Sequence, residues 1–165
     1  MERFQQLVQE SLKHAKYYVF HPTDFNVASS NAHLFTLPKD ADFICGDPST
    51  GKIFWCEVKN IKGKRFYGAS KGHYGRQFRR ALEIDASFGT YFYIINFNEM
   101  NLIAYFNPSM LEGTTFDPLA WPELRVTYLE KSHQTIFGKT VTQSLLDLSF
   151  LSDLFVADAT SESGF

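Results

Sequence analysis

Three charged side chains lie beside two apolar segments that flank a short turn. Asp42 precedes the first segment, and Glu57 and Lys59 follow the second. Side chains alternate along a strand, so Glu57 and Lys59 are expected on one face. A hairpin centred on the turn DPSTG sets Asp42 roughly opposite Glu57. This placement depends on the turn, because a slip of one residue would separate the two acids.

Two carboxylates that face each other repel unless a cation lies between them. Mg²⁺ binds one or two carboxylates together with carbonyl oxygens and waters. We therefore predict a Mg²⁺ site, in which Mn²⁺ is expected to substitute, with Asp42, Glu57 and the carbonyl of Val58 as ligands. Beside it, Lys59 can polarise a water or balance the charge of a phosphate, which suits phosphodiester hydrolysis. The alternative is a solvated pair at a strand end, because a Glu-x-Lys pattern alone has little specificity.

Half of the positive charge lies in residues 59–80, a segment without Asp or Glu. Lys and Arg bind backbone phosphates without reading sequence, and aromatic side chains can stack on an unpaired base. The alternative is a solvated loop that balances acids elsewhere. The predicted DNA-binding residues are Lys62, Lys64, Arg65, Lys71, Tyr74, Arg76, Arg79 and Arg80, with Phe66 and Tyr67 as further aromatic candidates.

The segments around these residues follow a recognisable order of helices and strands. An amphipathic helix is predicted over residues 2–16, from the helical spacing of Phe4, Val8 and Leu12. Further predicted elements are a strand at 17–21, a loop at 22–35, a hairpin at 41–59, a mobile basic loop at 60–75, a helix at 76–87, strands at 90–97 and 101–108, a strand at 124–130 and a terminal helix at 142–155. The expected fold is therefore α/β (α+β), a mixed β-sheet flanked by helices in the order αβββαβ.

Length and composition favour one domain. The chain has 165 residues, 44% of them hydrophobic, and its net charge of -2 excludes a uniformly basic nucleic-acid coat. We expect a single domain over residues 1–156, with a core at 2–106 and an extension at 107–156, then a disordered tail at 157–165.

The cysteines and the apolar runs indicate in which cellular compartment the protein is expected. Cys45 and Cys56 are not opposite one another in the predicted hairpin, so both are expected to be reduced. The longest apolar run is too short to cross a bilayer, and no apolar signal segment begins the chain. A soluble, intracellular protein is therefore predicted.

The segments ADFICG and FWCEVKN together resemble the signature of the PD-(D/E)XK nuclease superfamily. Within it, the small size, the early helix with Glu2, and Gln77 are most similar to Holliday junction resolvases of the archaeal and RecU types. The resemblance covers about residues 2–106 and implies a restriction-endonuclease-like core. Ala41 stands where the family has proline, which leaves Asp40 as an alternative to Asp42.

The resemblance also implies roles for residues. Asp42 and Glu57 would be metal ligands, Lys59 the catalytic lysine, and Gln77 a residue that organises the site. Glu2 in the first helix would complete the metal site, or would simply interact favourably with the helix dipole, and Glu10 is the other candidate.

By the same likeness, the protein would be a Mg²⁺-dependent, structure-selective DNA endonuclease of recombination and repair. It would cut four-way junctions as a homodimer, because two strands must be cut symmetrically. The expected location is the cytoplasm, in association with the nucleoid. The alternatives are a restriction-type or repair-type endonuclease of ordinary duplex DNA, and a non-catalytic DNA-binding module with the same fold.

Overall fold

The computed structural model describes residues 1–22, 40–69, 72–88, 90–129, 132–136, 139–151 and 153–154. The tail at 157–165 and most of the loop predicted at 22–35 lie outside these residues. Among the residues described, no helix has the length and apolar character that a membrane crossing requires.

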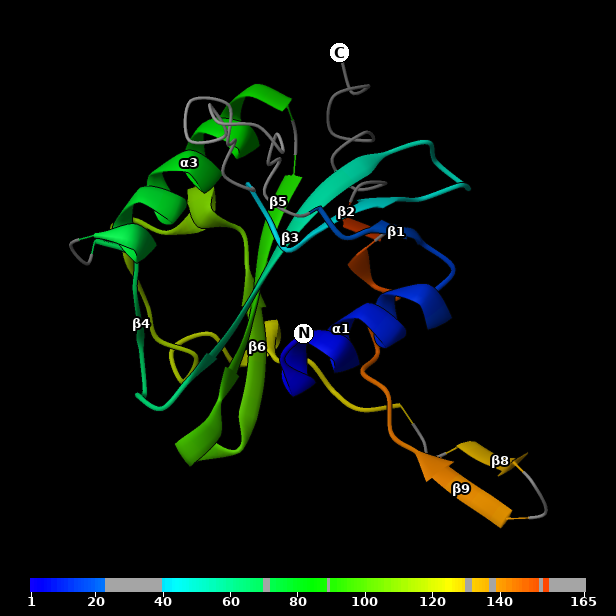
Figure 1. Cartoon of the computed structure of the whole chain (residues 1–165). Helices are drawn as coiled ribbons and strands as arrows, with labels where there is room; N and C mark the ends of the chain where they lie inside the picture. Colours follow the sequence, from blue (N-terminus) through cyan, green and yellow to red (C-terminus); the bar gives the residue numbers. More distant parts are fainter. Residues whose placement is uncertain are drawn as a thin grey trace, which may run out of the picture.

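A five-stranded mixed sheet forms the centre of the structure (Figure 1). The strands β3 and β5 are parallel, and all other neighbours in the sheet are antiparallel. Strand β5 is buried along most of its length, as expected from its nearly uninterrupted apolar sequence. In sheet order, the strands are β1 (Tyr18–Phe20), β2 (Phe43–Gly46), β3 (Ile53–Ile61), β5 (Thr90–Phe97) and β6 (Leu102–Phe106).

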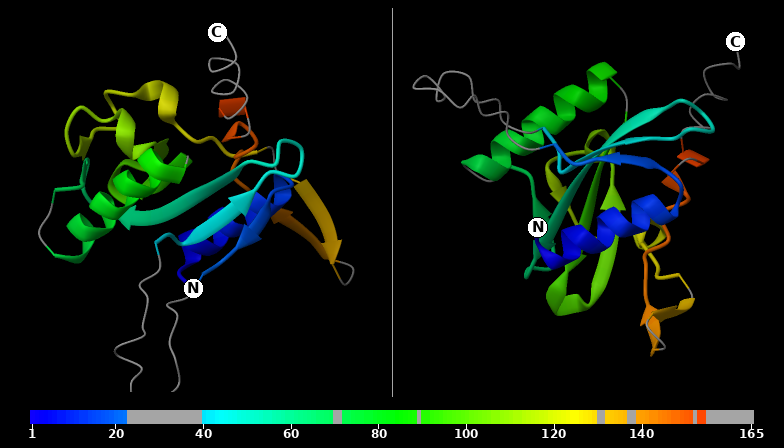
Figure 2. Two further views of the ribbon diagram at one scale, coloured as in Figure 1. Left: turned by 90° about the horizontal axis from the view of Figure 1, so that it is seen from above. Right: turned by 45° about the vertical axis from the view of Figure 1, so that its right-hand side comes forward.

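Two helices cover opposite faces of this sheet (Figures 1 and 2). Helix α1 (Arg3–His14) buries Phe4, Val8 and Leu12 against β2 and β3, which follows from their helical spacing. Helix α3 (His73–Phe88) buries Phe78, Ala81 and Ile84 on the other face, against β5. The predicted mixed α/β fold and its αβββαβ order are confirmed.

The hairpin of β2 and β3 has the predicted register. Phe43 is opposite Cys56, and Cys45 is opposite Phe54, so the two thiols do not face each other. Both cysteines are free and buried. The turn closes with a 2.8 Å hydrogen bond from the N–H of Gly51 to the carbonyl of Asp47, and Gly51 has a φ of 72°, a conformation that glycine adopts without strain.

The basic segment contains more regular structure than predicted. Strand β3 continues to Ile61, and a short strand β4 (Phe66–Tyr67) pairs with β7 (Thr115–Phe116). Helix α3 begins at His73 instead of residue 76. The prediction of one continuous mobile loop was wrong. Phe66 is buried in the core against Phe78 of α3 and the ring of Tyr93, and this packing holds the segment in place.

The segment after residue 113 departs furthest from the sequence-based prediction. The strand predicted at 124–130 is reduced to two isolated bridges, Ala104 with Arg125 and Tyr128 with Leu146. The helix predicted at 142–155 was wrong over 142–150, where the chain leaves strand β9 (Lys139–Gln143) and continues irregularly. The leucines at its centre pack singly into the core on the α1 face, so their spacing was not helical periodicity. The remaining elements are β8 (Ser132–Ile136), which pairs with β9, and the 3-10 turns η1 (Asn98–Met100), η2 (Pro108–Met110) and η3 (Pro122–Leu124).

Candidate active site

The Asp42 carboxylate lies against the backbone of β3. Its Oδ2 accepts a hydrogen bond of 2.8 Å from the N–H of Val58, and its Oδ1 accepts one of 3.0 Å from Nε2 of Gln5 on α1. Asp42 as a whole residue is 6% exposed. Two such bonds to a buried carboxylate fix its orientation.

Asp42 lies directly before strand β2. Strand β2 begins at Phe43, the next residue. The N–H of Val58 on β3 therefore donates to the side chain of Asp42 and not to a backbone carbonyl of β2. The N–H and C=O of one strand residue point to the same side, so the Val58 carbonyl also faces the end of β2. Asp42 and the Val58 carbonyl therefore lie at the same edge of β3.

Glu57 directly precedes Val58 on β3 and is also buried, with 4% exposure. Phe43 is opposite Cys56 in the antiparallel register of β2 and β3, so the preceding residue Asp42 is opposite the following residue Glu57. Burial raises the pKa values of Tyr91 and Tyr93 most, and the charges of Glu57 and Asp42 raise both values further. Both acids therefore lie near the same two tyrosines. The structure thus brings the two predicted carboxylates together.

Lys59 and Gln77 complete this group from two different elements. The Nζ of Lys59 donates a hydrogen bond of 2.7 Å to Oε1 of Gln77, and it lies 3.7 Å from Oε1 of Glu57. Lys59 comes from β3 and Gln77 from α3, so the packing of α3 on the sheet determines where the ammonium group lies.

The donor set fits a hard divalent cation. Asp42, Glu57 and the Val58 carbonyl offer only oxygen atoms, which is the preference of Mg²⁺ and Mn²⁺. The described residues contain no group of three or more His, Cys, Asp or Glu side chains that could hold a metal ion. Two carboxylates with a carbonyl suffice for Mg²⁺, which keeps several waters when it binds to protein.

The alternative acids have other partners. Asp40 accepts a hydrogen bond of 3.0 Å from Nε of Arg80 at the surface of α3. Glu2 is the N-cap of α1, since its carboxylate accepts from the N–H groups of Phe4 and Gln5 at 3.0 and 3.1 Å. Glu10 is exposed on α1. Asp40 is thus engaged with α3, whereas Glu2 caps α1 and also accepts a hydrogen bond of 3.2 Å from Nδ2 of Asn60 on β3.

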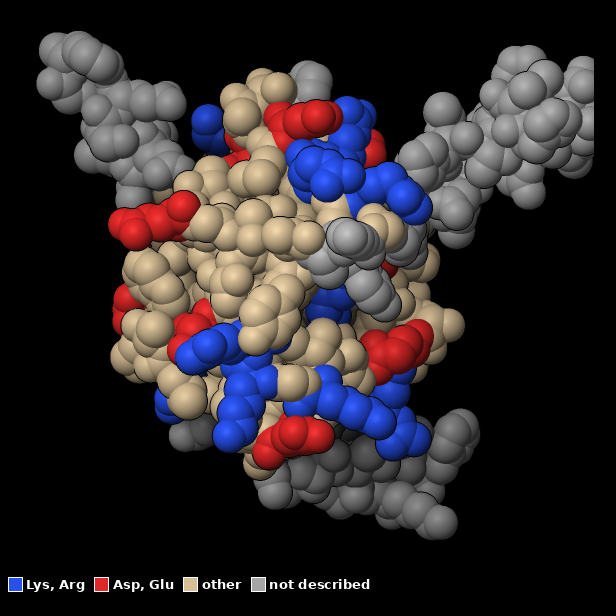
Figure 3. Space-filling model, turned by 90° about the vertical axis from the view of Figure 1, so that its left-hand side faces the viewer, with Lys and Arg blue, Asp and Glu red and all other residues tan. Residues whose placement is uncertain are grey.

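The basic residues gather in two groups on the side of the molecule that carries α3 and β4 (Figure 3). Lys62, Lys64, Arg76 and Arg79 are exposed and form no ion pair with any residue that the structure describes.

The other four predicted DNA-binding residues either form ion pairs or have side chains outside the described part of the structure. Arg65 pairs with Asp117 at 3.4 Å, and Arg80 pairs with Asp40 and Glu83 at 3.0 and 3.1 Å. Lys71 lies outside the described residues, and the side chain of Tyr74 is not described.

The two aromatic candidates of this segment have different environments. Phe66 is only 6% exposed and packs against Tyr93 and Phe106, so the prediction that it stacks on a base was wrong. Tyr67, its neighbour on β4, is 59% exposed and stays a candidate. Alternation along a two-residue strand explains the difference.

Sequence reasoning missed three residues that contact the predicted acids or pair with their strand. Gln5 bonds to Asp42, the Oη of Tyr91 donates to the carbonyl of Asp40 at 2.5 Å, and Tyr93 is the strand partner of Glu57. The tyrosines were recognised only as part of a buried strand, and Gln5 lies beside the apolar stripe of α1. No local pattern distinguishes such residues, because their partners are distant in sequence.

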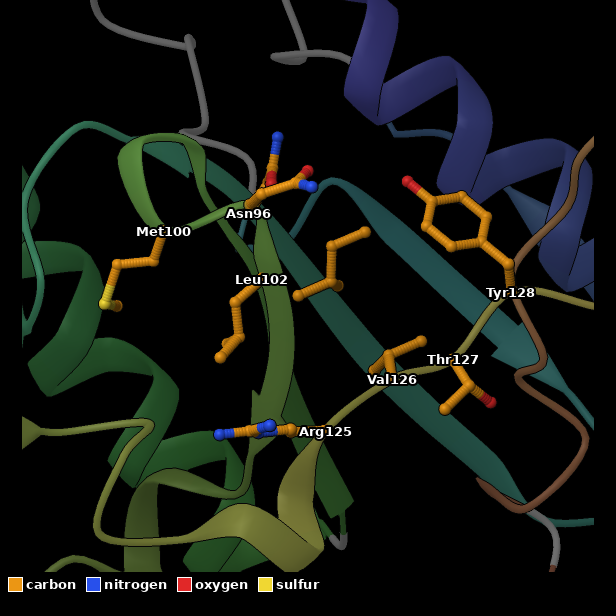
Figure 4. A pocket seen from close by; sticks show the side chains of 9 residues that line it. Asn96, Met100, Leu102, Arg125, Val126, Thr127 and Tyr128 are labelled. Atoms are coloured by element: carbon orange, nitrogen blue, oxygen red, sulfur yellow. The ribbon is translucent and has the colours of Figure 1, made fainter.

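A cavity of about 300 Å³ lies elsewhere, where the segment after η3 passes the β5–β6 end of the sheet (Figure 4). Asn96, Leu102, Arg125 and Tyr128 are among its lining residues. None of the predicted catalytic or DNA-binding residues lines this cavity.

The architecture is shared with a solved structure. The chain is similar to Hjc from Archaeoglobus fulgidus, a Holliday junction resolvase from an archaeal hyperthermophile, with a TM-score of 0.51 and 18% sequence identity. The match covers 73% of this chain and 91% of that chain. At this identity the likeness shows a common fold, which confirms the resemblance found in the sequence at the level of the fold. No family model matches the sequence, and no curated protein matches it.

Proposed function

We propose that the protein is a metal-dependent endonuclease that hydrolyses phosphodiester bonds in branched DNA, with the four-way junction as its substrate. The observation that carries the proposal is the buried Asp42–Glu57 pair beside Lys59, on a fold shared with a Holliday junction resolvase. Fold likeness alone would not assign an activity, because one fold serves many functions.

The residues have distinct tasks in this proposal. Asp42, Glu57 and the Val58 carbonyl hold Mg²⁺, or Mn²⁺ in its place. When bound, the cation neutralises charge on the phosphate and lowers the pKa of water. The ammonium group of Lys59 faces the developing negative charge on the phosphate, and Gln77 keeps this group in position through its 2.7 Å hydrogen bond.

The exposed basic residues supply the surface for the DNA backbone. Lys62 and Lys64 follow β3, which carries Glu57 and Lys59, and Arg76 and Arg79 lie on α3 around Gln77. A backbone that contacts both groups passes the candidate site. Such contacts are independent of sequence, which suits recognition of a DNA shape.

A symmetric junction calls for two sites, so we propose a homodimer with C₂ symmetry as the active form. Sedimentation on the free protein and on its complex with a four-way junction tests this. Two protomers bound per junction support the dimer, and a single protomer that makes both cuts contradicts it.

The central experiment compares labelled four-way junction, flap and linear duplex DNA, each with Mg²⁺ or with a chelator. Symmetric cuts in the junction that require Mg²⁺ are expected. Equal cutting of linear duplex would indicate a restriction-type or repair-type endonuclease instead, and binding without cleavage under any divalent cation would indicate a non-catalytic module.

Two substitutions assign the chemistry to the site. Asp42→Asn and Glu57→Gln each remove a ligand charge, so both are expected to abolish cleavage while junction binding persists. Glu112→Gln, at an exposed position before β7, serves as the matched control and should cleave like the wild type. Cleavage at the wild-type rate by either site variant would remove that residue from the mechanism.

A further inference from the structure

Strand β5 carries a buried tyrosine, Tyr93, next to Glu57 of the candidate site. The hydroxyl of Tyr93 on β5 is buried and has no hydrogen-bond partner among the residues that the structure describes. Tyr93 is 0% exposed. Buried polar groups in folded proteins almost always have a partner, so an orphaned hydroxyl points to a water, an ion or a ligand-dependent contact.

The position of Tyr93 relates it directly to Glu57. The two residues are partners in the parallel register of β3 and β5, so their side chains stand next to each other on the α3 face of the sheet. On its other side, Tyr93 stacks on Phe106 of β6, with ring centroids 5.0 Å apart and an interplanar angle of 1°. Phe66 and Phe78 pack against the same ring. The surroundings on these sides are therefore hydrocarbon.

Electrostatics also connects the hydroxyl with the acids. Burial raises the pKa of Tyr93, and the charges of Glu57 and then Asp42 raise it further. The hydroxyl is therefore protonated and available as a donor throughout the neutral range. Within the described part of the chain, the charged groups that raise this pKa are the two proposed metal ligands.

Tyr91 provides an internal comparison. It lies two residues earlier on the same strand and face, and its hydroxyl donates to the carbonyl of Asp40. A tyrosine hydroxyl in this layer can therefore be satisfied by the protein. The hydroxyl of Tyr93, beside Glu57, differs in having no such partner in the part of the chain that the structure describes.

We propose that Tyr93 is a positioning residue whose hydroxyl donates a hydrogen bond to the Glu57 carboxylate when that carboxylate turns to bind a divalent cation. Carboxylates that bind metals are commonly oriented by such donors, and loss of the donor weakens binding 10- to 100-fold in typical cases. The proposal rests on the function proposed above, since it needs Glu57 to be a metal ligand.

The test measures Mn²⁺ affinity of the full-length protein by calorimetry, for the wild type and for Tyr93→Phe. We expect the variant to bind Mn²⁺ about tenfold more weakly. Its melting temperature without metal should equal or exceed that of the wild type, because the substitution removes an unpaired buried hydroxyl. Tyr105→Phe, which removes a hydroxyl from the opposite face of the sheet, should leave the affinity unchanged.

A kinetic measurement separates metal positioning from other roles. In cleavage assays, Tyr93→Phe should raise the Mg²⁺ concentration for half-maximal rate, while kcat at saturating Mg²⁺ stays close to that of the wild type. A lower kcat with unchanged metal affinity would overturn the proposal.

Other outcomes are equally decisive. Equal Mn²⁺ affinity of Tyr93→Phe and the wild type would overturn the role of Tyr93 and leave the proposed nuclease intact. A wild type that binds no Mn²⁺ would overturn both proposals.

Discussion

Lys59 on β3 and Gln77 on α3 are joined by a hydrogen bond of 2.7 Å between Nζ and Oε1. The same ammonium group lies 3.7 Å from Glu57. Lys59 is thereby held between a carboxylate of its own strand and an amide from the helix that packs on the sheet. Its position depends on an interaction between elements that are separate in the chain.

Replacement of Gln77 by Ala should lower kcat for junction cleavage by about 100-fold, the usual scale for misplacing a catalytic group by about 1 Å. The ammonium loses its acceptor on α3, which removes the contact that joins it to the helix. Junction affinity should change little. Single-turnover cleavage and a binding titration measure both effects.

The control for this change is Gln6→Ala on α1, where the side chain is exposed. It should leave kcat unaltered. If Gln77→Ala also cleaved at the wild-type rate, Gln77 would have no part in holding Lys59.

Arg79 and Arg80 are neighbours with different surroundings, and they should contribute differently to DNA binding. Arg80 is engaged with Asp40 and Glu83, whereas Arg79 has no ion-pair partner in the described part of the chain. Arg79→Ala should reduce the slope of log K against log salt by about 0.9 for each phosphate that the arginine neutralises. Arg80→Ala should change the slope less. Binding isotherms over a range of salt concentrations give these slopes, and equal slopes for the two variants would contradict the prediction.

Gly68 precedes α3, at a point where the backbone touches the ring of Phe78. A Cβ at Gly68 would approach three ring atoms of Phe78 at 2.7 to 2.9 Å, so the ring would have to move. Phe78 is 1% exposed and follows Gln77 on α3. Gly68→Ala should therefore lower the free energy of unfolding by about 1 to 3 kcal/mol, as overpacking of a core typically does.

Gly63 is the matched control for this substitution. A Cβ there meets only the carbonyl oxygen of Arg65, at an ordinary 3.7 Å. Gly63→Ala should leave stability unchanged or raise it by about 0.4 to 1 kcal/mol, because the unfolded chain has less conformational freedom. Urea unfolding measures the stability of both variants. Equal changes in the free energy of unfolding would contradict a destabilising clash between the new Cβ at residue 68 and Phe78.

Stability should decline at alkaline pH. Burial raises the pKa of Cys45 from an ordinary value of 9.0 to about 12, and burial also raises that of Cys56. The fold thus binds these protons more tightly than the unfolded chain, so their contribution is complete below about pH 9 and is lost as the pH rises toward 12. Each thiol can contribute up to about 1.4 kcal/mol per pH unit within that window.

Urea unfolding at pH 8, 9, 10 and 11 measures this loss. A variant that carries Cys45→Ala and Cys56→Ala should show a smaller decline between pH 9 and 10, although the buried tyrosines Tyr91 and Tyr93 still contribute above pH 10. A free energy of unfolding that is constant over this range would contradict the prediction.

Local sequence patterns were sufficient for the core of the fold. The turn DPSTG and the alternation beside it correctly predicted the register of Phe43 with Cys56, and the run from Thr90 to Phe97 correctly predicted β5. These signals are local, because turn chemistry and side-chain periodicity act over a few residues. They failed after residue 113, where leucines at near-helical spacing pack singly against the core.

The sequence by itself determined which residue types are available for chemistry, namely two acids, a lysine and a glutamine, and it determined the strands and helices that carry most of them. Only the tertiary structure decided that Asp42, just before β2, bonds to Val58 and Gln5. It also decided that the hydroxyl of Tyr93 is buried beside Glu57 without a partner among the described residues. The physical reason is that these contacts join α1, β2, β3 and β5 across long stretches of chain. Their geometry follows from how the elements pack, which no local pattern of residues encodes.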